Sequence, residues 1–124
     1  MTLVLDAAAL IALDRGDRRT AALIEVAHRD RRDIVVPAAV VGQAWRDGSR
    51  QVLLARLLGS RDVQIEPLTD TVARAAGVLC GRTSTSDVID ASVVISARHH
   101  RAAVLSSDRD DLEFLDPGLP IIDC

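Results

Sequence analysis

The sequence has almost no aromatic residues and no lysine. Its 124 residues include one Phe, one Trp and no Tyr, so a buried core has to be built from Ala, Val, Leu and Ile. Because every basic side chain is Arg, chemistry that depends on a lysine nucleophile is excluded. The two cysteines, Cys80 and Cys124, provide neither a disulfide framework nor the spacing of a zinc site. These absences favour a reducing cytosol, and we expect a cytoplasmic protein.

Several other patterns are absent, and each absence excludes a class of protein. The longest early apolar run, Ala7 to Leu13, is too short to cross a bilayer, and no basic segment precedes it. The first apolar run is not followed by the glycine-rich turn of a dinucleotide site, and no P-loop or G-x-S-x-G motif is present. Phosphoaspartyl receivers and dehalogenase-like phosphatases usually need a lysine. The histidines lie in Arg-rich polar stretches that are more typical of a solvated surface than of a catalytic centre: His28, His99 and His100.

The composition is that of one globular domain. The chain is 48% apolar and 27% charged, and its length suits a single core. It contains no repeat, linker or low-complexity tract, so residues 1–124 are expected to form one domain. The formal net charge of −3 argues against a protein that coats nucleic acid by charge alone, but it allows contact with a phosphate through metal ions.

Short apolar runs rich in β-branched residues alternate with segments of helical periodicity. Strands are expected at residues 2–6, 33–37, 63–67, 102–108 (leading into a turn) and 120–123, and helices at 7–13, 19–29, 38–46, 51–59, 69–82, 86–101 and 111–115. Alternating strands and helices indicate an α/β fold, in which a parallel sheet carries helices on both faces.

Two of the predicted strands end in an aspartate, Asp6 and Asp108, and a helical segment follows each. Open parallel sheets bind their ligands at the carboxyl ends of the strands, so both acids lie where such folds do chemistry. The alternative is that each acid only caps the helix that follows it. For Asp108 this alternative is stronger, because Ser106 and Ser107 precede it and further acids follow in a polar turn.

Two more acids, Asp87 and Asp90, lie in the segment SDVIDASVV at residues 86–94. At positions i and i+3 they share one face of the first helical turn. Capping explains Asp87, but it explains Asp90 poorly, because this helix is apolar nearly all round and a buried carboxylate needs a cation. If these acids meet Asp6 and Asp108, a divalent metal would relieve their repulsion. Mg²⁺ suits such a site, and two-metal phosphodiester hydrolysis is the reaction that it serves best.

Three segments together carry a resemblance to a known family. They are VLDAAALIALDRGD at 4–17, with an acid at Asp6; DVIDASVVISAR at 87–98, with an acid at Asp90; and AVLSSDRDDL at 103–112, with an acid at Asp108 after the hydroxyl residue Ser106. In order and spacing they resemble PIN-domain ribonucleases, specifically the VapC-type toxins of bacterial toxin–antitoxin pairs. The resemblance covers nearly the whole chain. It implies a PIN-like three-layer α/β/α sandwich around a mainly parallel sheet of four to five strands.

The same resemblance implies a divalent-metal-dependent ribonuclease. Asp6, Asp90 and Asp108 would be the catalytic acids and would hold Mg²⁺ or Mn²⁺ together with Asp87. Ser106 and Gln43 would support these ligands or contact the substrate, since the amide oxygen of Gln43 can be offered to a metal or to its water. Arg side chains around the cleft would position the RNA backbone. The resemblance further implies a homodimer and a VapB-like antitoxin that silences the enzyme by covering the acidic pocket.

One position departs from the family pattern. Gln43 stands where the third helix of the family usually carries a glutamate, so one negative charge is missing, and Asp87 could compensate. The departure favours an alternative function, a degenerate PIN domain that binds RNA or a protein partner without cutting. A third option is a small metal-dependent phosphatase. The apolar VLLARLL segment at 52–58 is a candidate dimer surface, although core packing is its simpler use.

Overall fold

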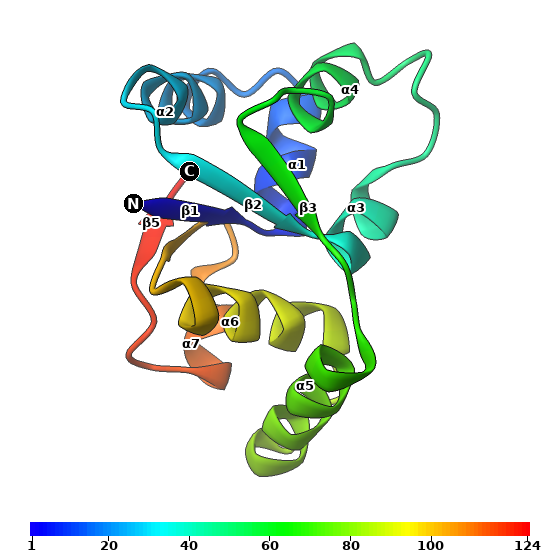
Figure 1. Ribbon diagram of the computed structural model, residues 1–124, viewed down its shortest axis with the longest axis vertical. Helices are drawn as coiled ribbons and strands as arrows, with labels where there is room; N and C mark the ends of the chain where they lie inside the picture. Colours follow the sequence, from blue (N-terminus) through cyan, green and yellow to red (C-terminus); the bar gives the residue numbers. More distant parts are fainter.

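In the computed structural model, residues 1–124 form a five-stranded sheet between two layers of helices (Figure 1). The strands are β1 (Thr2–Leu5), β2 (Asp33–Pro37), β3 (Val63–Glu66), β4 (Ala103–Ser106) and β5 (Ile121–Asp123). Their order across the sheet is β3-β2-β1-β4-β5, and every neighbouring pair is parallel. The predicted α/β fold with a parallel sheet and helices on both faces is therefore confirmed, with five strands.

Figure 1 shows α1, α2 and α4 on one face of the sheet and α5, α6 and α7 on the other. The helices are α1 (Ala7–Asp14), α2 (Arg18–Arg29), α3 (Ala38–Ala44), α4 (Val52–Leu58), α5 (Asp70–Thr83), α6 (Val88–His100) and α7 (Arg109–Leu115). Every expected element is present. The largest differences concern three helices. α3 ends at Ala44, because the backbone of Trp45 is extended; α6 begins at Val88, two residues later than predicted, because Asp87 is its N-cap; and α7 begins two residues earlier than predicted.

The hydrophobic core contains 29 buried residues and no aromatic side chain. It consists of Ala, Val, Leu and Ile together with Cys80, as the composition predicted. Leu3, Val4 and Leu5 of β1 are all buried, because helices cover this central strand from both faces. The backbone at the end of β1 is therefore held in place by packing on both faces, and so is Asp6, the residue that follows it.

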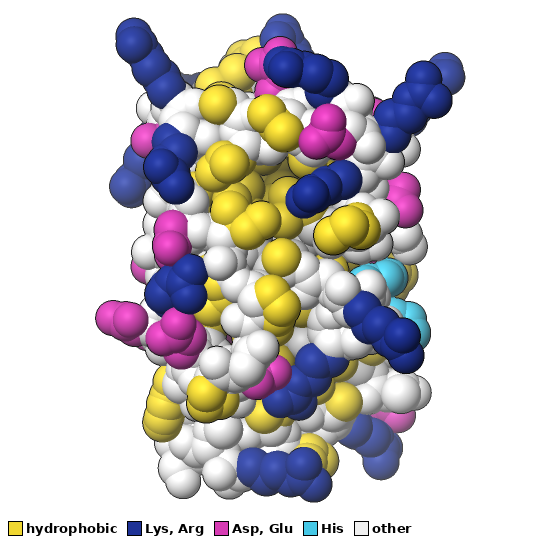
Figure 2. Space-filling model, turned by 90° about the vertical axis from the view of Figure 1, so that its left-hand side faces the viewer, with side chains coloured by type: hydrophobic (Ala, Val, Ile, Leu, Met, Phe, Trp, Pro, Cys, Tyr) yellow, Lys and Arg dark blue, Asp and Glu magenta, His cyan; other side chains and the backbone are white.

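The surface mixes charges of both signs, and apolar side chains gather around a hollow in the upper half of the face shown in Figure 2. A groove of about 380 Å³ between α1, α2 and α4 is lined by Leu13, Ile24 and Leu53 among others. In the VLLARLL segment, Leu54 and Leu57 are buried and serve the core, whereas Val52 and Leu53 are exposed. None of the helices combines the length and the apolar character that a membrane span requires.

Candidate acidic site at the carboxyl edge of the sheet

Asp6 is held at the junction of the two central strands. It follows β1 directly and is only 2% exposed. Its backbone N–H donates to the carbonyl oxygen of Leu105 (3.4 Å), and its carboxylate accepts from the Ser106 hydroxyl (2.5 Å) and from the Ala9 backbone N–H (2.9 Å). Burial raises the pKa of Asp6, although these two hydrogen bonds partly oppose the rise. The carboxylate therefore has a fixed orientation at the predicted edge of the sheet.

Ser106 also fixes the start of α7, where Asp108 lies. The Ser106 oxygen accepts from the backbone N–H of Asp108 at 2.8 Å. Asp108 occupies the N-cap position of α7, yet its side chain makes no capping hydrogen bond, whereas the Asp6 side chain does cap α1. The alternative that Asp108 only caps a helix, which the sequence favoured more strongly for Asp108 than for Asp6, is therefore wrong. The negative charge of Asp108 also raises the pKa of Asp6, so the two carboxylates are close enough to repel each other.

Asp87 and Asp90 share the first turn of α6, as predicted. Asp87 caps the helix, because its carboxylate accepts from the Asp90 backbone N–H at 3.0 Å. Burial, the charge of Asp87 and a hydrogen bond to its side chain, and the charges of Asp6 and Asp111 together raise the pKa of Asp90 to about 7. The Asp90 carboxylate is therefore close enough to be repelled by acids from three segments of the chain: the end of β1, the start of α6 and the first turn of α7. The first turn of α6 faces the edge at which β1 and β4 end.

Asp111 is a member of this site that the sequence prediction missed. Helix α7 begins at Arg109 rather than at Asp111, so Asp108 and Asp111 lie three residues apart around its first turn. The spacing repeats that of Asp87 and Asp90, and this repeat was the available sequence signal. A hollow of about 290 Å³ over the same turn is lined by Ser107, Asp108, Arg109, Asp110 and Asp111.

We call Asp6, Asp87, Asp90, Asp108 and Asp111 the acidic cluster. None of its members forms an ion pair with an arginine or a histidine. Even Arg109, which directly follows Asp108, is bonded to Glu113 and Asp123 instead. The cluster is therefore uncompensated by the protein itself.

The donor set of the acidic cluster fits a hard divalent cation. Carboxylates are the ligands that Mg²⁺ and Mn²⁺ prefer. No three acidic, histidine or cysteine side chains lie in a ready-made metal-binding arrangement. Because Asp87, Asp108 and Asp111 are exposed, their side chains have the rotamer freedom to draw together around an ion.

Gln43 lies on the exposed side of α3, and its side chain forms no hydrogen bond within the protein. Helix α3 packs against α1 and α6, the two helices whose N-terminal ends carry Asp6 and Asp90. Nothing in the fold therefore fixes the amide of Gln43, and a carboxylate at this position would meet no steric obstacle.

The histidines lie outside the acidic cluster, but two of them are not simply solvated. His100 is hydrogen-bonded to the Glu66 carboxylate, which lies at the end of β3, and both side chains are partly buried. His28 faces Asp62 at 3.4 Å, and only His99 is exposed. These contacts join distant segments of the chain and give the histidines structural roles.

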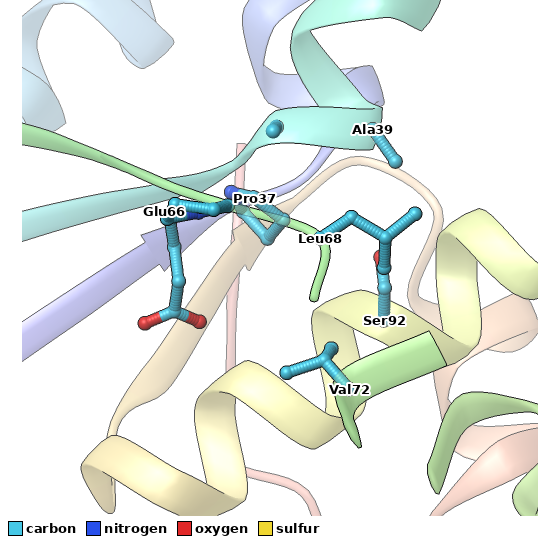
Figure 3. A pocket seen from close by; sticks show the side chains of 8 residues that line it. Pro37, Ala39, Glu66, Leu68, Val72 and Ser92 are labelled. Carbon is cyan, nitrogen blue, oxygen red and sulfur yellow. The ribbon is translucent and has the colours of Figure 1, made fainter. Parts of the chain in front are cut away.

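A small cavity lies between the ends of β2 and β3 and helix α6 (Figure 3). Its volume is about 10 Å³, which is room for one water molecule. Pro37, Leu68 and Val72 line it, and the Ser92 hydroxyl donates to the carbonyl oxygen of Ile89. The cavity is too small and too apolar to bind a substrate, so the acidic cluster remains the candidate site.

Comparison with known proteins agrees with this geometry. The crystal structure of VapC20 from Mycobacterium tuberculosis, described as a sarcin-ricin loop cleaving toxin, superposes with a TM-score of 0.69 at 20% identity, covering 94% of this chain and 95% of that chain. VapBC2 from Rickettsia felis, bound to a promoter DNA fragment, gives 0.71 at 13% identity, covering 99% and 98%. FitAcB from Neisseria gonorrhoeae gives 0.68 at 15% identity, covering 97% and 96%. These likenesses show a shared fold.

No curated protein matches the sequence significantly. A sequence model described as the PIN domain matches residues 3–116, which include the whole acidic cluster. The chain therefore belongs to the PIN domain family.

Proposed function

We propose that the protein is a VapC-type endoribonuclease toxin that hydrolyses RNA phosphodiester bonds with the help of Mg²⁺ or Mn²⁺. The observation that supports this function best is the uncompensated acidic cluster, in which the pKa of Asp90 is raised to about 7. Structural acids are normally paired with a cation, whereas strongly perturbed carboxylates at the carboxyl edge of a sheet are typical of a functional site. The structural neighbours include a toxin that is described as cleaving an RNA loop.

The members of the acidic cluster differ in burial, and we propose a different task for each. Asp6 is buried and oriented by Ser106, so it supplies a fixed carboxylate at the base of the site. Asp90, on α6, is half-buried and close enough to Asp6 to repel it, while the exposed Asp108 borders the hollow over the first turn of α7. When bound, a divalent metal would activate a water molecule and neutralise the charge that develops on the phosphoryl oxygens.

A protein antitoxin and a second copy of the chain are the partners that we propose. Two of the structural neighbours are toxin–antitoxin assemblies by their descriptions, VapBC2 and FitAB. A VapB-like antitoxin that covers the acidic cluster would need cationic side chains, because the cluster has no counter-charge of its own. Co-purification with the product of a small neighbouring gene, followed by loss of cleavage, tests this partner.

Cleavage of RNA by the purified protein, freed of any antitoxin, tests the function directly. A mixed pool of tRNA and rRNA is incubated with Mg²⁺, with Mn²⁺ and with EDTA. We expect cleavage that requires the metal and is lost in Asp6→Asn and Asp90→Asn. Asp30→Asn is the control, since Asp30 is an exposed aspartate at the end of α2, outside the site, and does not contribute to the pKa of Asp6 or Asp90. Full activity of Asp6→Asn would disprove the assigned site.

The second candidate is a PIN domain that binds RNA or a protein without cutting. Gln43 supports it, because the exposed face of α3 contributes no carboxylate. If the folded protein binds RNA but does not cleave it with either metal, this second function replaces the first.

A further inference from the structure

Trp45 is the only tryptophan of the chain, and it lies on the surface. Its side chain is 38% exposed, and the only other aromatic residue, Phe114, is 57% exposed. The core contains no aromatic ring at all. Tryptophan combines a large apolar ring with a polar N–H and is enriched at binding surfaces for this reason. The position of Trp45 therefore calls for a use other than core packing.

The loop that follows α3 is built around the Trp45 ring. A Cβ atom at Gly48 would come within 2.5 Å of the ring atom Cζ2, so the six-membered ring lies directly against the backbone of this glycine. The buried Gln51 fixes the loop, because its Oε1 accepts from the backbone N–H groups of Arg46 (2.7 Å) and Asp47 (2.9 Å). A ring that is already fixed loses little entropy when a ligand stacks on it.

Gln51 also ties this loop to the rest of the protein. Its Nε2 donates to the carbonyl oxygen of Ala44 (2.9 Å) and to the carboxylate of Asp14 at the end of α1 (3.2 Å). The side chain of Gln51 thus joins the two ends of loop 45–51 to each other and ties the loop to the end of α1. Trp45 is held as a fixed surface platform rather than as a side chain on a loose loop.

The platform lies close to the acidic cluster. Helix α3 starts where β2 ends, next to the first turn of α6 in Figure 1, and packs against α1 and α6. Its seven residues rise about 10 Å in total, so Trp45 stands within about that distance of the end of β2. Gly42 and Gln43, in the last turn of α3, are exposed, so a bound strand can reach this part of the helix.

A positive charge adjoins the ring. The Arg46 guanidinium donates to the carbonyl oxygens of Gly42 (3.0 Å) and Trp45 (2.6 Å) and forms no ion pair with any acid. Its charge is therefore available to a phosphate, and its position is fixed by the two carbonyls. An aromatic face beside an unpaired arginine is the combination that binds single-stranded nucleic acid.

We propose that Trp45 stacks on an unpaired base of the RNA strand whose phosphodiester lies at the acidic cluster, with Arg46 contacting the backbone. Such stacking requires an unpaired base, because the bases of a duplex are stacked on one another and offer no free face. This inference rests on the proposed ribonuclease function and assigns to Trp45 and Arg46 the recognition of the strand beside the acidic cluster.

Fluorescence tests the proposal, since Trp45 is the only tryptophan and the chain has no tyrosine. The wild-type protein in EDTA, which prevents metal-dependent cleavage, is titrated with an unstructured RNA of about 12 nucleotides and with the same strand in a full duplex. We expect saturable quenching by the single strand and at least about tenfold weaker quenching by the duplex. Equal quenching by both, or RNA binding detected by anisotropy without any quenching, would overturn the proposal.

Variants provide the second measurement. Trp45→Leu keeps an apolar side chain but lacks the π-face, and should weaken single-strand affinity about 5- to 100-fold, whereas Trp45→Phe should retain most of it. Val52→Ala removes a comparably exposed apolar side chain from α4 and should bind as the wild type does. Circular dichroism checks that each variant is folded. Unchanged affinity of folded Trp45→Leu contradicts the proposal.

The outcomes separate this inference from the ribonuclease function. Quenching by single strands without cleavage in any metal would sustain the stacking platform and reject the enzyme. Metal-dependent cleavage with no quenching and with equal use of duplex RNA would sustain the enzyme and reject the platform. If the emission of the free protein changes with its own concentration, Trp45 is a contact between two copies of the chain, and the proposal is wrong.

Discussion

Replacing Asp90 with asparagine should stabilise the metal-free protein at neutral and alkaline pH. Burial and the charges of Asp87, Asp6 and Asp111 raise the pKa of Asp90 from 3.8 to about 7. The unfolded chain releases this proton near pH 4, whereas the folded protein keeps it until about pH 7. Relative to the unfolded chain, the folded protein thus loses stability as the pH rises through this window, and above it the loss is complete.

The size of the effect follows from the same values. A pKa of about 7 instead of 3.8 corresponds to at most about 4 kcal/mol. Asp90 is only half-buried, so solvent screening reduces the penalty, and we expect Asp90→Asn to gain about 1–2 kcal/mol at pH 8. For a chain of this length the gain raises Tm by about 3–8 °C. At pH 4 the variant and the wild type should unfold together.

Thermal unfolding in EDTA, followed by circular dichroism at pH 4 and at pH 8, measures this gain. Asp110→Asn serves as the control and should shift Tm little, because Asp110 is exposed and does not raise the pKa of Asp90. Mn²⁺ should reduce the advantage of the variant, since a cation bound to the folded wild type stabilises it. The reasoning is refuted if Asp90→Asn is less stable than the wild type at pH 8, or if it gains as much at pH 4.

Three further substitutions test other parts of the site and its support. Ser106→Ala removes a donor to the buried Asp6 carboxylate, so it should cost about 1–3 kcal/mol in urea unfolding and lower cleavage, whereas the exposed Ser107→Ala should do neither. Gln43→Glu adds a charge at an unconstrained position and should increase Mn²⁺-dependent cleavage at an unchanged Tm; a decrease would contradict this. Gln51→Glu loses two donated hydrogen bonds and should cost about 1–3 kcal/mol, unlike Gln64→Glu on the exposed edge strand, and equal Tm values would contradict it.

The positions of the strands and helices were predictable because each depends on local pattern. Residues 34–36 form a continuous apolar run that is followed by Pro37, and the structure forms β2 over Asp33–Pro37, as predicted. The order of the strands depends instead on pairing between distant segments. β1 lies between β2 and β4, and no periodicity within residues 2–6 carries that information.

For the site, too, the edge of the sheet could be predicted from the sequence, whereas the full set of residues could not. Asp6 directly follows β1, and Asp108 lies two residues beyond the neighbouring strand β4, so their placement at one edge followed from the rule for parallel sheets. Asp111 was missed because the start of α7 was placed two residues late, which hid its spacing from Asp108. The hydrogen bonds from Gln51 to Asp14 and from His100 to Glu66 join residues that are 37 and 34 positions apart, so a pattern within one helix or strand could not predict them.

The hydrogen bond between Ser106 and Asp6 closes a loop of 100 residues, and it has a consequence for the order of folding. The first strand of the chain can pair with β2 early, but its other edge is completed only when β4, nearly the last strand, pairs with it. Closing so long a loop costs entropy, and parallel pairing over such a separation is slow. A growing or partly folded chain therefore holds its acids apart. Whatever chemistry the acidic cluster performs has to wait until the two halves of the chain have met.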